Sequence, residues 1–463
     1  MKFTIPHNIV KETIGSVSIT HAEAKFADNS DLKISTNSLE INSDEWFLAL
    51  IGEKHDAHKF LDSLADKVAG VIVQADRIDE NDFKQKFKNY LIVDNTLTFF
   101  QECAANYIEG WKDKGGTVIS MTGSNGKTTC KEYLASILME IYPEKVYATE
   151  GNYNNHIGVP YTCFQVKDDH KYAVIEMGTS GHGEIKRLCE IARPDAGFIT
   201  NIGLAHIEIL KSREGVFNEK RALYDWIVEN SRRDNFKFLI NSEDMYLDKL
   251  ERSEAVLDIT EAIEATSDQV KLKVENEKIS ILSPKVFGKI NFFNLGLVSL
   301  FLKHFTGEEM YKIVNAAYNL TPPQNNRSTW IEWKEKSVYL DAYNANPSSM
   351  KASLDAFFEF VNSKYIPLEK VCLIIGDMNE LGESAEEHHR EIARFASKGN
   401  RADKVKCLFV GNNTTFYSSG CDSDFTSFKN VDELKPNLEG ELLGAQYVFV
   451  KGSRSVQLEK LFQ

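Results

Sequence analysis

The sequence predicts an α/β protein of several units, in which the central unit is a mostly parallel sheet with helices on both faces. Short apolar runs alternate with helical segments along the whole chain. The pattern of residues 116–138 predicts a strand, a Gly-rich turn and an amphipathic helix in direct succession. With 463 residues, the chain is too long for one ordinary core and predicts about two to four domains.

The first hundred residues predict an α/β unit of their own. Buried strands are expected at residues 46–52, 70–74 and 89–94, because each run is apolar and short, and helical patterns lie between them. We place this unit at residues 1–112.

The second unit is expected at residues 113–321. After the strand that opens it, further buried strands are expected at residues 172–178 and 196–203. The apolar run at residues 292–302 is too short to span a bilayer and predicts a buried helix.

The third unit is expected at residues 322–463. Pro322 and Pro323 open a polar stretch that is typical of a linker. Four β-rich runs separated by helical segments then predict another α/β unit. They lie at residues 338–344, 370–377, 405–412 and 446–452.

Charge and cysteine content narrow the class of protein. The formal net charge is -14, so nucleic-acid binding, which depends on neutralising phosphates, is not expected. The 7 cysteines form no CxxC pair or zinc-ligand spacing, which favours free thiols in a reducing compartment. The N-terminal residues lack an apolar segment typical of a secretory signal. These patterns indicate a cytoplasmic protein without membrane insertion.

A loop suited to cradling phosphates follows the first strand of the second unit. Its residues are Thr122, Gly123, Ser124, Asn125, Gly126, Lys127, Thr128 and Thr129. Glycines let backbone N–H groups point toward an anion, and the helix N-terminus adds positive potential. In such loops the lysine contacts the β- and γ-phosphates, and the threonine after it coordinates Mg²⁺. The usual pattern has a glycine where this chain has Met121, so a chance turn is the alternative.

Polar residues also follow other predicted strands, at the edge where parallel sheets bind ligands. Glu176 could hold Mg²⁺ beside the phosphates, or it could form an ion pair or cap a helix. His206, taken alone, is expected to be an ordinary loop residue. Lys220, taken alone, is expected on a solvated helix face. Three further candidates are equally typical of turns: Asn152, Asn155 and Asp341.

Together these segments resemble the Mur ligase family over nearly the whole chain. The first unit carries GEKHDAHKF at residues 52–60. The second carries TGSNGKTT, GNYNNHIGVP, AVIEMG, TNIGLAHIE and FNEKRALYD in family order. The third carries DAYNANPSSM, GDMNELGESAEEHHREI and VKGSRS. The DAYNANP and GDMNELGE segments are specific to the branch that adds a D-alanyl-D-alanine dipeptide.

The resemblance implies a role for each candidate residue. Thr128 and Glu176 would hold a first magnesium ion, and His206 would help to hold a second. Lys220 matches the family lysine that reacts with CO₂ to give a metal-binding carbamate. Asn152 and Asn155 match a segment near the nucleotide. The remaining two matches are Arg327, for the arginine that reaches the ATP phosphates, and Asp341, for the aspartate that contacts the ribose.

The resemblance also implies a three-domain architecture. An N-terminal UDP-substrate domain and a C-terminal Rossmann-like ligase domain would flank a central domain that resembles phosphate-loop ATPases. The implied enzyme is a monomeric, cytoplasmic ligase that uses ATP and Mg²⁺ in peptidoglycan precursor synthesis. It would join D-alanyl-D-alanine to UDP-N-acetylmuramoyl-tripeptide through an acyl phosphate.

Two alternatives stay open at this point. One is another amino-acid ligase of the same superfamily. The other is a nucleotide-binding regulatory protein without catalysis, which the segment GTSGHGEI at residues 178–185 favours because the family commonly has GANHxGEI. The motifs also leave open whether the third residue of the tripeptide is meso-diaminopimelate or lysine.

Overall fold

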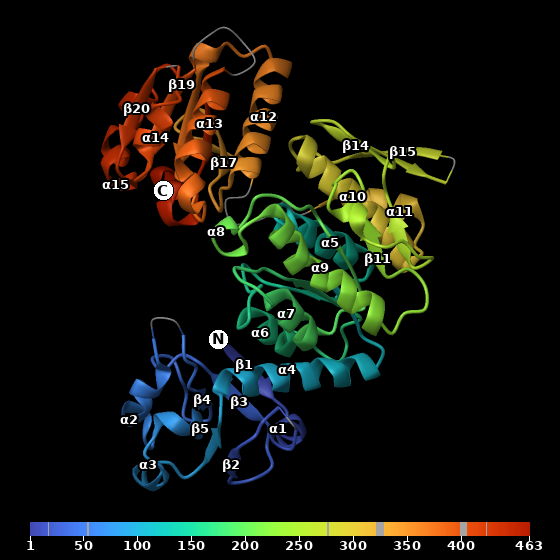
Figure 1. Cartoon of the computed structure of the whole chain (residues 1–463), viewed down its shortest axis with the longest axis vertical. Coiled ribbons are helices and arrows are strands. Elements are labelled where there is room, and N and C mark those ends of the chain that lie inside the picture. Colours follow the sequence, from blue (N-terminus) through green and yellow to red (C-terminus); the bar gives the residue numbers. More distant parts are fainter. Residues whose placement is uncertain (17, 53–54, 276, 321–327, 399–404, 423) are drawn as a thin grey trace.

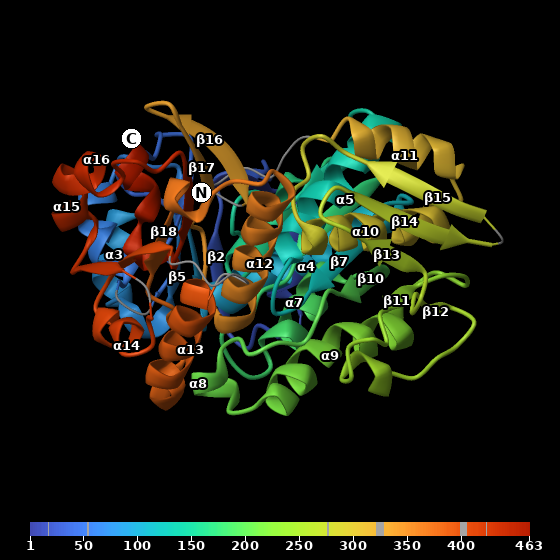
Figure 2. The same cartoon turned by 90° about the horizontal axis from the view of Figure 1, so that it is seen from above.

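Three lobes follow one another along the chain in the computed structural model, with the first and third on the same side of the second (Figure 1, Figure 2). The structure describes residues 1–463 except 17, 53–54, 276, 321–327, 399–404 and 423. The predicted linker at Pro322 and Pro323 lies outside the described residues. The domain boundaries at residues 112 and 321 therefore stay a prediction.

The first lobe is built on a six-stranded sheet with the order β1-β3-β4-β5-β6-β2. Its strands are β1 (Lys2–Ile5), β2 (Ala22–Lys25), β3 (Leu32–Ser35), β4 (Trp46–Leu48), β5 (Gly70–Gln74) and β6 (Tyr90–Val93). The three predicted strands are β4, β5 and β6, which pair in parallel at the centre. Strand β4 ends at Leu48 rather than at the predicted Gly52. The shorter helices of the first lobe are α1 (His7–Ile14), α2 (Leu61–Leu64) and α3 (Glu80–Lys86).

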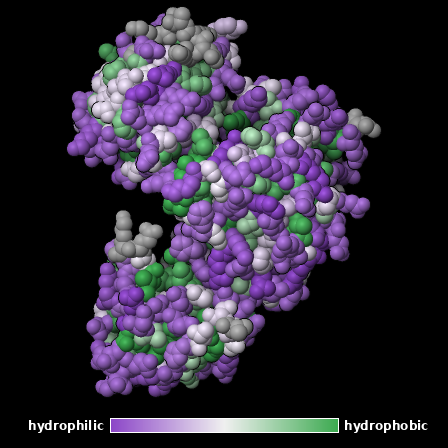
Figure 3. Space-filling model, in the orientation of Figure 1, coloured by the Kyte–Doolittle hydropathy of each residue, from purple (hydrophilic) through white to green (hydrophobic). Residues whose placement is uncertain are grey.

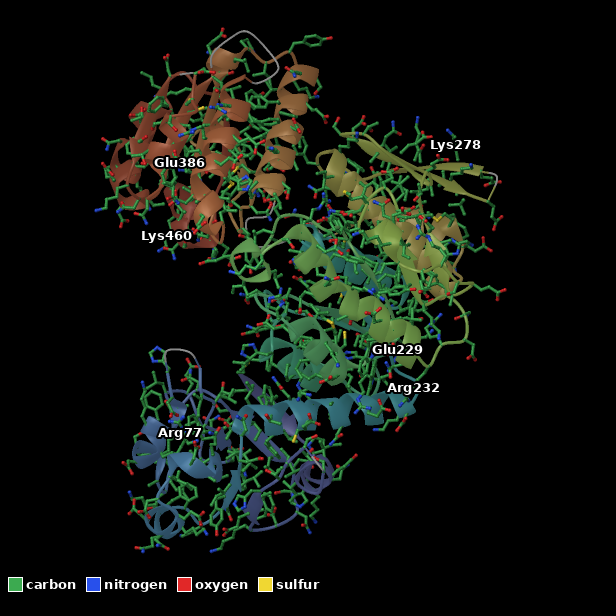
Figure 4. All side chains as sticks on the ribbon, in the orientation of Figure 1. Arg77, Glu229, Arg232, Lys278, Glu386 and Lys460 are labelled. Atoms are coloured by element: carbon green, nitrogen blue, oxygen red, sulfur yellow. The ribbon has the colours of Figure 1, made fainter. Side chains whose placement is uncertain are left out.

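Helix α4 (Thr96–Asp113) joins the first lobe to the second. It packs against α6 (Gly158–Gln165) and α7 (Glu184–Ala192) of the second lobe. A buried ion pair fixes its end, where Lys112 Nζ lies 2.9 Å from Asp195 Oδ1 with both side chains 3% exposed. Near the same end Arg232, labelled in Figure 4, pairs with Glu109 and Asp113 of α4.

The second lobe contains the predicted parallel sheet. Its order is β12-β11-β10-β7-β9-β8, and every pairing in it is parallel. The strands are β7 (Thr117–Thr122), β8 (Val146–Ala148), β9 (Tyr172–Glu176), β10 (Ala196–Ile199), β11 (Phe238–Ile240) and β12 (Val256–Asp258). In addition to α6 and α7, the helices of this lobe include α5 (Lys127–Ile141), α9 (Arg213–Asn230), α10 (Lys289–Thr306) and α11 (Met310–Tyr318).

Helices cover both faces of this sheet, as the sequence predicts. Successive residues of β7 point to opposite faces, so Val118 joins one apolar core and Ile119 the other. The predicted buried helix at residues 292–302 lies within α10 and packs against α5. A small antiparallel sheet, which the sequence patterns do not predict, covers α10. It contains β13 (Ile263–Ala265), β14 (Gln269–Val274) and β15 (Glu277–Leu282).

The third lobe has a six-stranded sheet with the order β16-β17-β21-β18-β19-β20. Its strands are β16 (Thr329–Trp333), β17 (Lys336–Asp341), β18 (Val371–Gly376), β19 (Lys406–Val410), β20 (Phe425–Phe428) and β21 (Tyr447–Lys451). Strands β17, β18, β19 and β21 match the four predicted runs, and all but β16 pair in parallel. The helices include α12 (Pro347–Ser363), α13 (Ala385–Lys398), α14 (Thr414–Ser418), α15 (Val431–Leu434) and α16 (Leu438–Glu441).

Polar groups cover most of the face seen in Figure 3, which is hollowed between the first and third lobes. Among the described residues, no helix is both long and apolar enough to cross a membrane. The carboxyl edges of the second and third sheets meet near α8 (Ile207–Leu210).

Candidate active site

The loop between β7 and α5 has the backbone of a phosphate cradle. Gly123 and Gly126 have φ of 151° and 81°, in the region that favours glycine. A Cβ atom on Gly123 would lie 1.8 Å from Thr200 Oγ1, so no larger residue fits there. The loop also accepts hydrogen bonds from the segment after β10, including one from Thr200 Oγ1 to the Asn125 carbonyl at 2.6 Å. The helix N-terminus at Lys127 therefore faces a shaped loop suited to an anion.

Lys127 lies folded over this loop. Its Nζ donates to the carbonyl oxygens of Gly123 at 2.6 Å and of Ser124 at 3.4 Å. Thr129 follows in the first turn of α5. Because the ammonium stands at the mouth of the loop, it is placed to meet an anion bound there.

Glu176 and Thr128 form a buried polar pair at the edge of the sheet. Thr128 Oγ1 donates to Glu176 Oε1 at 3.0 Å, and the two residues are 6% and 1% exposed. The other carboxylate oxygen, Oε2, is buried and has no hydrogen-bond partner. Leaving such an oxygen unpartnered is costly, which a bound cation would relieve.

This pair fits magnesium by its chemistry. Mg²⁺ prefers oxygen ligands and is usually bound by one or two carboxylates together with substrate phosphates. Within the described part of the chain, no group of three or more His, Cys, Asp or Glu residues is arranged to hold a metal by itself. A magnesium ion here would therefore need phosphate oxygens to complete its coordination.

Asn154 contacts Glu176, although its sequence context is equally typical of a turn and gave it no role in the site. Its Nδ2 donates to Glu176 Oε1 at 2.8 Å. The predicted nucleotide residues beside it have other surroundings in this structure. Asn155 Oδ1 accepts from the backbone N–H of Gly158 at 2.8 Å at the start of α6, and Asn152 is exposed. The asparagine-rich segment pointed to the right place, but the spacing could not tell which asparagine faces Glu176.

Lys220 is buried, so the expectation of a solvated helix face is wrong. It is 1% exposed on α9, because that face of the helix packs on the sheet. Burial lowers the pKa of Lys220 well below its usual value, and the nearby charge of Lys127 lowers this pKa further. The negative charge of Glu219 raises the pKa of Lys220 and so opposes this decrease. The surroundings thus favour a neutral amine.

Glu219, the neighbour of Lys220, anchors the segment at residues 178–185. Its carboxylate accepts from the backbone N–H of Gly183 at 2.6 Å and of Ile185 at 2.8 Å. This ties α9 to the start of α7. The altered segment GTSGHGEI is therefore held against the same helix that carries Lys220.

His206 contacts the third lobe. It follows β10 and lies at the start of α8 with φ of 55°. Its Nδ1 lies 2.7 Å from Glu380 Oε2, in the loop after β18. The hydrogen bond to His206 lowers the pKa of Glu380, and the charge of Lys127 lowers this pKa too. Sequence reasoning missed Glu380, although it lies within the GDMNELGE segment.

Asn125 forms a second bridge between the lobes. Its side chain accepts from Asn346 Nδ2 at 2.7 Å and donates to Ser348 Oγ at 2.8 Å. Asn346 also caps α12, because its side chain accepts from the backbone N–H of Ser349 at 2.9 Å. The third lobe therefore docks on the phosphate loop through the start of one helix.

Asp341 lies at the end of β17, paired with a lysine. Its Oδ2 accepts from Lys451 Nζ at 2.5 Å and from Ser353 Oγ at 2.9 Å. Lys451 is another residue that the sequence reasoning missed. It ends β21, the neighbouring parallel strand, so only the strand order brings the two together. Arg327 lies outside the described residues.

A cavity of about 150 Å³ lies between the second and third lobes. Its lining includes Ser124, Lys127, His206, Asn344, Asn346, Asn379, Glu380, Ser453 and Arg454. The structure thus brings Lys127 and His206 to one cavity, with Thr128 adjacent in the chain. Asp341 does not line this cavity in the present arrangement.

The phosphate loop lies at the carboxyl edge of a parallel sheet and faces a second α/β lobe. This arrangement is typical of enzymes that bind a nucleotide through its phosphates. The family model described as the Mur ligase middle domain matches residues 121–301. The one described as the Mur ligase, glutamate ligase domain matches residues 326–454. The chain belongs to the Mur ligase family.

Curated relatives match over nearly their whole length. The chain is 30% identical to the UDP-N-acetylmuramoyl-tripeptide--D-alanyl-D-alanine ligase of Escherichia coli, over 96% of this chain and 95% of the relative. The relative of the same name from Haemophilus influenzae is 30% identical, with 92% of each chain covered. That from Bacillus subtilis is 28% identical, over 98% of this chain and 97% of the relative.

Solved structures share the fold. A crystal structure of MurF from Acinetobacter baumannii matches with a TM-score of 0.83 at 24% identity, covering 100% of this chain and 98% of that one. The structure of MurF ligase from Thermotoga maritima in complex with ADP gives a TM-score of 0.75 at 21% identity. It covers 92% of this chain and 95% of that one. The three-domain Mur ligase fold predicted from the sequence is thus confirmed.

Proposed function

We propose that this ligase joins D-alanyl-D-alanine to the terminal carboxylate of UDP-N-acetylmuramoyl-tripeptide, with conversion of ATP to ADP and phosphate. The observation that carries the proposal is the buried Glu176–Thr128 pair, with its unpartnered oxygen, behind a phosphate loop. The reaction named for the relatives that are 30% identical over nearly the full chain supports this substrate pair.

In the first step, a carboxylate oxygen of the tripeptide attacks the γ-phosphorus of ATP. The bond from that phosphorus to the bridging oxygen breaks, and ADP leaves. Carboxylate and γ-phosphate are both anions, so they must be held together against their repulsion. Lys127 supplies one positive charge at the loop, and Arg327 is proposed to supply another. The rest of the loop, from Gly123 to Thr129, would bind the phosphates through backbone N–H groups.

In the second step, the amine of the dipeptide attacks the acyl carbon. The carbon–oxygen bond to the phosphoryl group breaks, phosphate leaves, and the nitrogen loses a proton. A free carboxylate would have to expel oxide, whereas the acyl phosphate expels phosphate. This is why an enzyme with a phosphate loop suits amide formation.

Magnesium would be held by Thr128 and Glu176 beside the β- and γ-phosphates, and a second ion would be held with the help of His206. When bound, Mg²⁺ offsets negative charge on the transferring phosphoryl group. The unpartnered Oε2 of Glu176 supports the first site.

Lys220 is proposed to react with CO₂. Its neutral amine would attack the carbon of CO₂ and form a C–N bond, while one C=O π bond opens and its electron pair moves to oxygen. Loss of a proton from the nitrogen then yields an anionic carbamate. The low pKa of Lys220 supports this step, because only the neutral amine is a nucleophile. A carbamate would also bring a negative charge near the positive charge of Lys127, and the two would attract each other.

The remaining proposals concern the contacts with the nucleotide, the oligomeric state and the cellular compartment. Asn152 and Asn155 are proposed to lie near the nucleotide, and Asp341 is proposed to contact its ribose after movement of the third lobe. We propose that the enzyme is a monomer in the cytoplasm. The free thiols of the chain, most of them buried, suit a reducing compartment.

The test is phosphate release by the purified protein with ATP and Mg²⁺. UDP-N-acetylmuramoyl-tripeptide and D-alanyl-D-alanine are supplied singly and together. Release that needs both, with a product heavier by the dipeptide less water, would support the proposal. Release with another amino acid in place of the dipeptide would favour a different ligase of the family. ATP binding without release under any combination would favour a protein that has lost catalysis.

A further inference from the structure

Glu380 reaches the cavity from the third lobe and meets His206 of the second. The Oε2–Nδ1 distance is 2.7 Å. A carboxylate can only accept, so Nδ1 carries the ring proton in the neutral histidine. The lone pair is then on Nε2. Among the described residues that line the cavity, Glu380 is the one with a carboxylate.

The backbone on both sides of this contact is strained. His206 has φ of 55° and Glu380 has φ of 62°, in the left-handed region that favours glycine. The two side chains are 24% and 59% exposed, and exposed ion pairs add little stability. The contact therefore adds little to the stability of the fold, which favours a role in the site.

The loop that carries Glu380 is braced on two sides. The backbone N–H of Asn379 donates to Ser453 Oγ at 2.9 Å, and its Nδ2 donates to Ser455 Oγ at 2.8 Å. From α13, His389 Nε2 accepts from the backbone N–H of Met378 at 3.1 Å. These bonds hold Glu380 toward His206 without any help from the second lobe.

We propose that Glu380 is a positioning residue for His206. By accepting from Nδ1, it holds the ring in the tautomer that leaves Nε2 as a metal ligand. A carboxylate behind a metal-binding histidine orients the ring and makes it a better ligand. Because Glu380 belongs to the third lobe, docking of that lobe would complete the second metal site. This inference rests on the proposed function, in which His206 helps to hold a metal.

The experiment measures metal binding by the full chain in the presence of ADP. Mn²⁺ replaces Mg²⁺, and free Mn²⁺ is followed by electron paramagnetic resonance. The variants are Glu380→Ala, which removes the acceptor, and Glu380→Gln, which keeps an amide oxygen that can still accept. Glu387→Gln is the matched control, since this exposed residue of α13 does not line the cavity. Circular dichroism checks that each variant is folded.

We expect Glu380→Ala to weaken one Mn²⁺ site by about 10- to 100-fold, the range found for such outer partners. Glu380→Gln should weaken the site less, and Glu387→Gln should match the wild type. Unchanged Mn²⁺ binding in Glu380→Ala would overturn the inference. So would tighter ADP binding in Glu380→Gln, because that result would mean the carboxylate competes with phosphate.

A parallel His206→Asn variant separates this inference from the function it rests on. If His206→Asn weakens Mn²⁺ binding and Glu380→Ala does not, only the positioning role falls. If neither variant changes Mn²⁺ binding, the proposed metal role of His206 falls with it. Amide formation measured by product mass tests the ligase reaction independently of both results.

Discussion

At the scale of single residues, two lysines of the second lobe have opposite surroundings. Lys127 lies at the mouth of the phosphate loop, while Lys220 is 1% exposed within the packed face of α9. The charge of Lys127 also lowers the pKa of Lys220. One lysine is therefore suited to neutralise phosphate, and the other to act as a nucleophile or a modified ligand.

Replacing Lys127 with alanine should reduce turnover by about 100-fold or more. It removes a positive charge from the place where negative charge gathers in the first step. Phosphate release under saturating substrates would measure the effect. Lys114→Ala is the control, since Lys114 forms an exposed pair with Asp168. A Lys127→Ala variant with wild-type turnover would contradict the placement.

Replacing Lys220 with alanine should also abolish most activity. A short carboxylic acid such as acetate should restore part of it, because the acid can enter the space left by the side chain and supply the missing carboxylate. Wild-type protein in ¹³C-labelled bicarbonate should give a carbamate signal by nuclear magnetic resonance that the variant lacks. Unchanged activity in Lys220→Ala, with or without bicarbonate, would refute the proposed carbamate.

At the scale of helices and strands, the central strands of each sheet could be predicted and the edges could not. Strands such as β5 and β18 are buried along their whole length, so their apolar runs are visible in the sequence. By contrast β2 reads AEAK and is largely exposed. It is a strand only because it pairs with β6, a contact across about seventy residues that no local pattern records.

The same limit applies to the site. Glu176 and the phosphate loop are local features of one strand end and one turn, so the sequence could predict them. The contacts of Asn154, Glu380 and Lys451 depend on which strands become neighbours and on how the lobes dock. The pattern also could not tell which side of α9 packs on the sheet, so the burial of Lys220 was not foreseen.

His389 makes the loop after β18 sensitive to acid. Burial lowers the pKa of His389, whose Nε2 accepts from Met378 N–H and whose Nδ1 lies 2.6 Å from the Ala385 carbonyl. The folded state therefore holds the ring neutral below the unfolded pKa of about 6.5. Stability is complete above that pH and is lost as the pH falls below it.

The expected loss is at most about 1.4 kcal/mol per pH unit. Thermal unfolding at pH 7.5 and 5.5 should show a larger drop in midpoint for the wild type than for His389→Gln, which has no titrating ring. Nearby Asp377 has a pKa raised by burial, and its charge opposes the shift of His389. Equal drops in the two proteins would contradict the assignment.

At the scale of the whole molecule, a buried ion pair fixes the first lobe to the second. Lys112 and Asp195 are each 3% exposed, and Asp195 Oδ2 also accepts from the backbone N–H of Val118 at 3.0 Å. Asp195→Asn should lower the free energy of unfolding by about 3–5 kcal/mol, because it leaves the buried Lys112 without its charged partner and with only the Arg193 carbonyl to accept from it. Urea unfolding measures the change.

The double variant Lys112→Met with Asp195→Asn should lose less than the single variant, since no charge is then left buried. Lys114→Ala, at an exposed residue that directly follows α4, should change the free energy by less than about 1 kcal/mol. A double variant that is less stable than Asp195→Asn alone would contradict this account of the junction.

Binding of substrates should bring the lobes closer together. Asp341 belongs to the third lobe and the phosphate loop to the second, and Asp341 does not line the cavity between them. Small-angle scattering with an ATP analogue and the nucleotide-linked tripeptide should give a smaller radius of gyration than the free protein. An unchanged radius would argue against closure.

The first and third lobes stand on the same side of the second, with a hollow between them (Figure 3). In the proposed reaction, a substrate whose sugar-nucleotide end is held by the first lobe would have to extend across that hollow for its far carboxylate to arrive at the phosphate loop. The distance between the lobes would then select the length of the substrate peptide. A peptide that is one residue too short stops before the loop, and one that is too long overshoots it. The enzyme would therefore select its substrate by the length of the peptide as well as by the identity of its side chains.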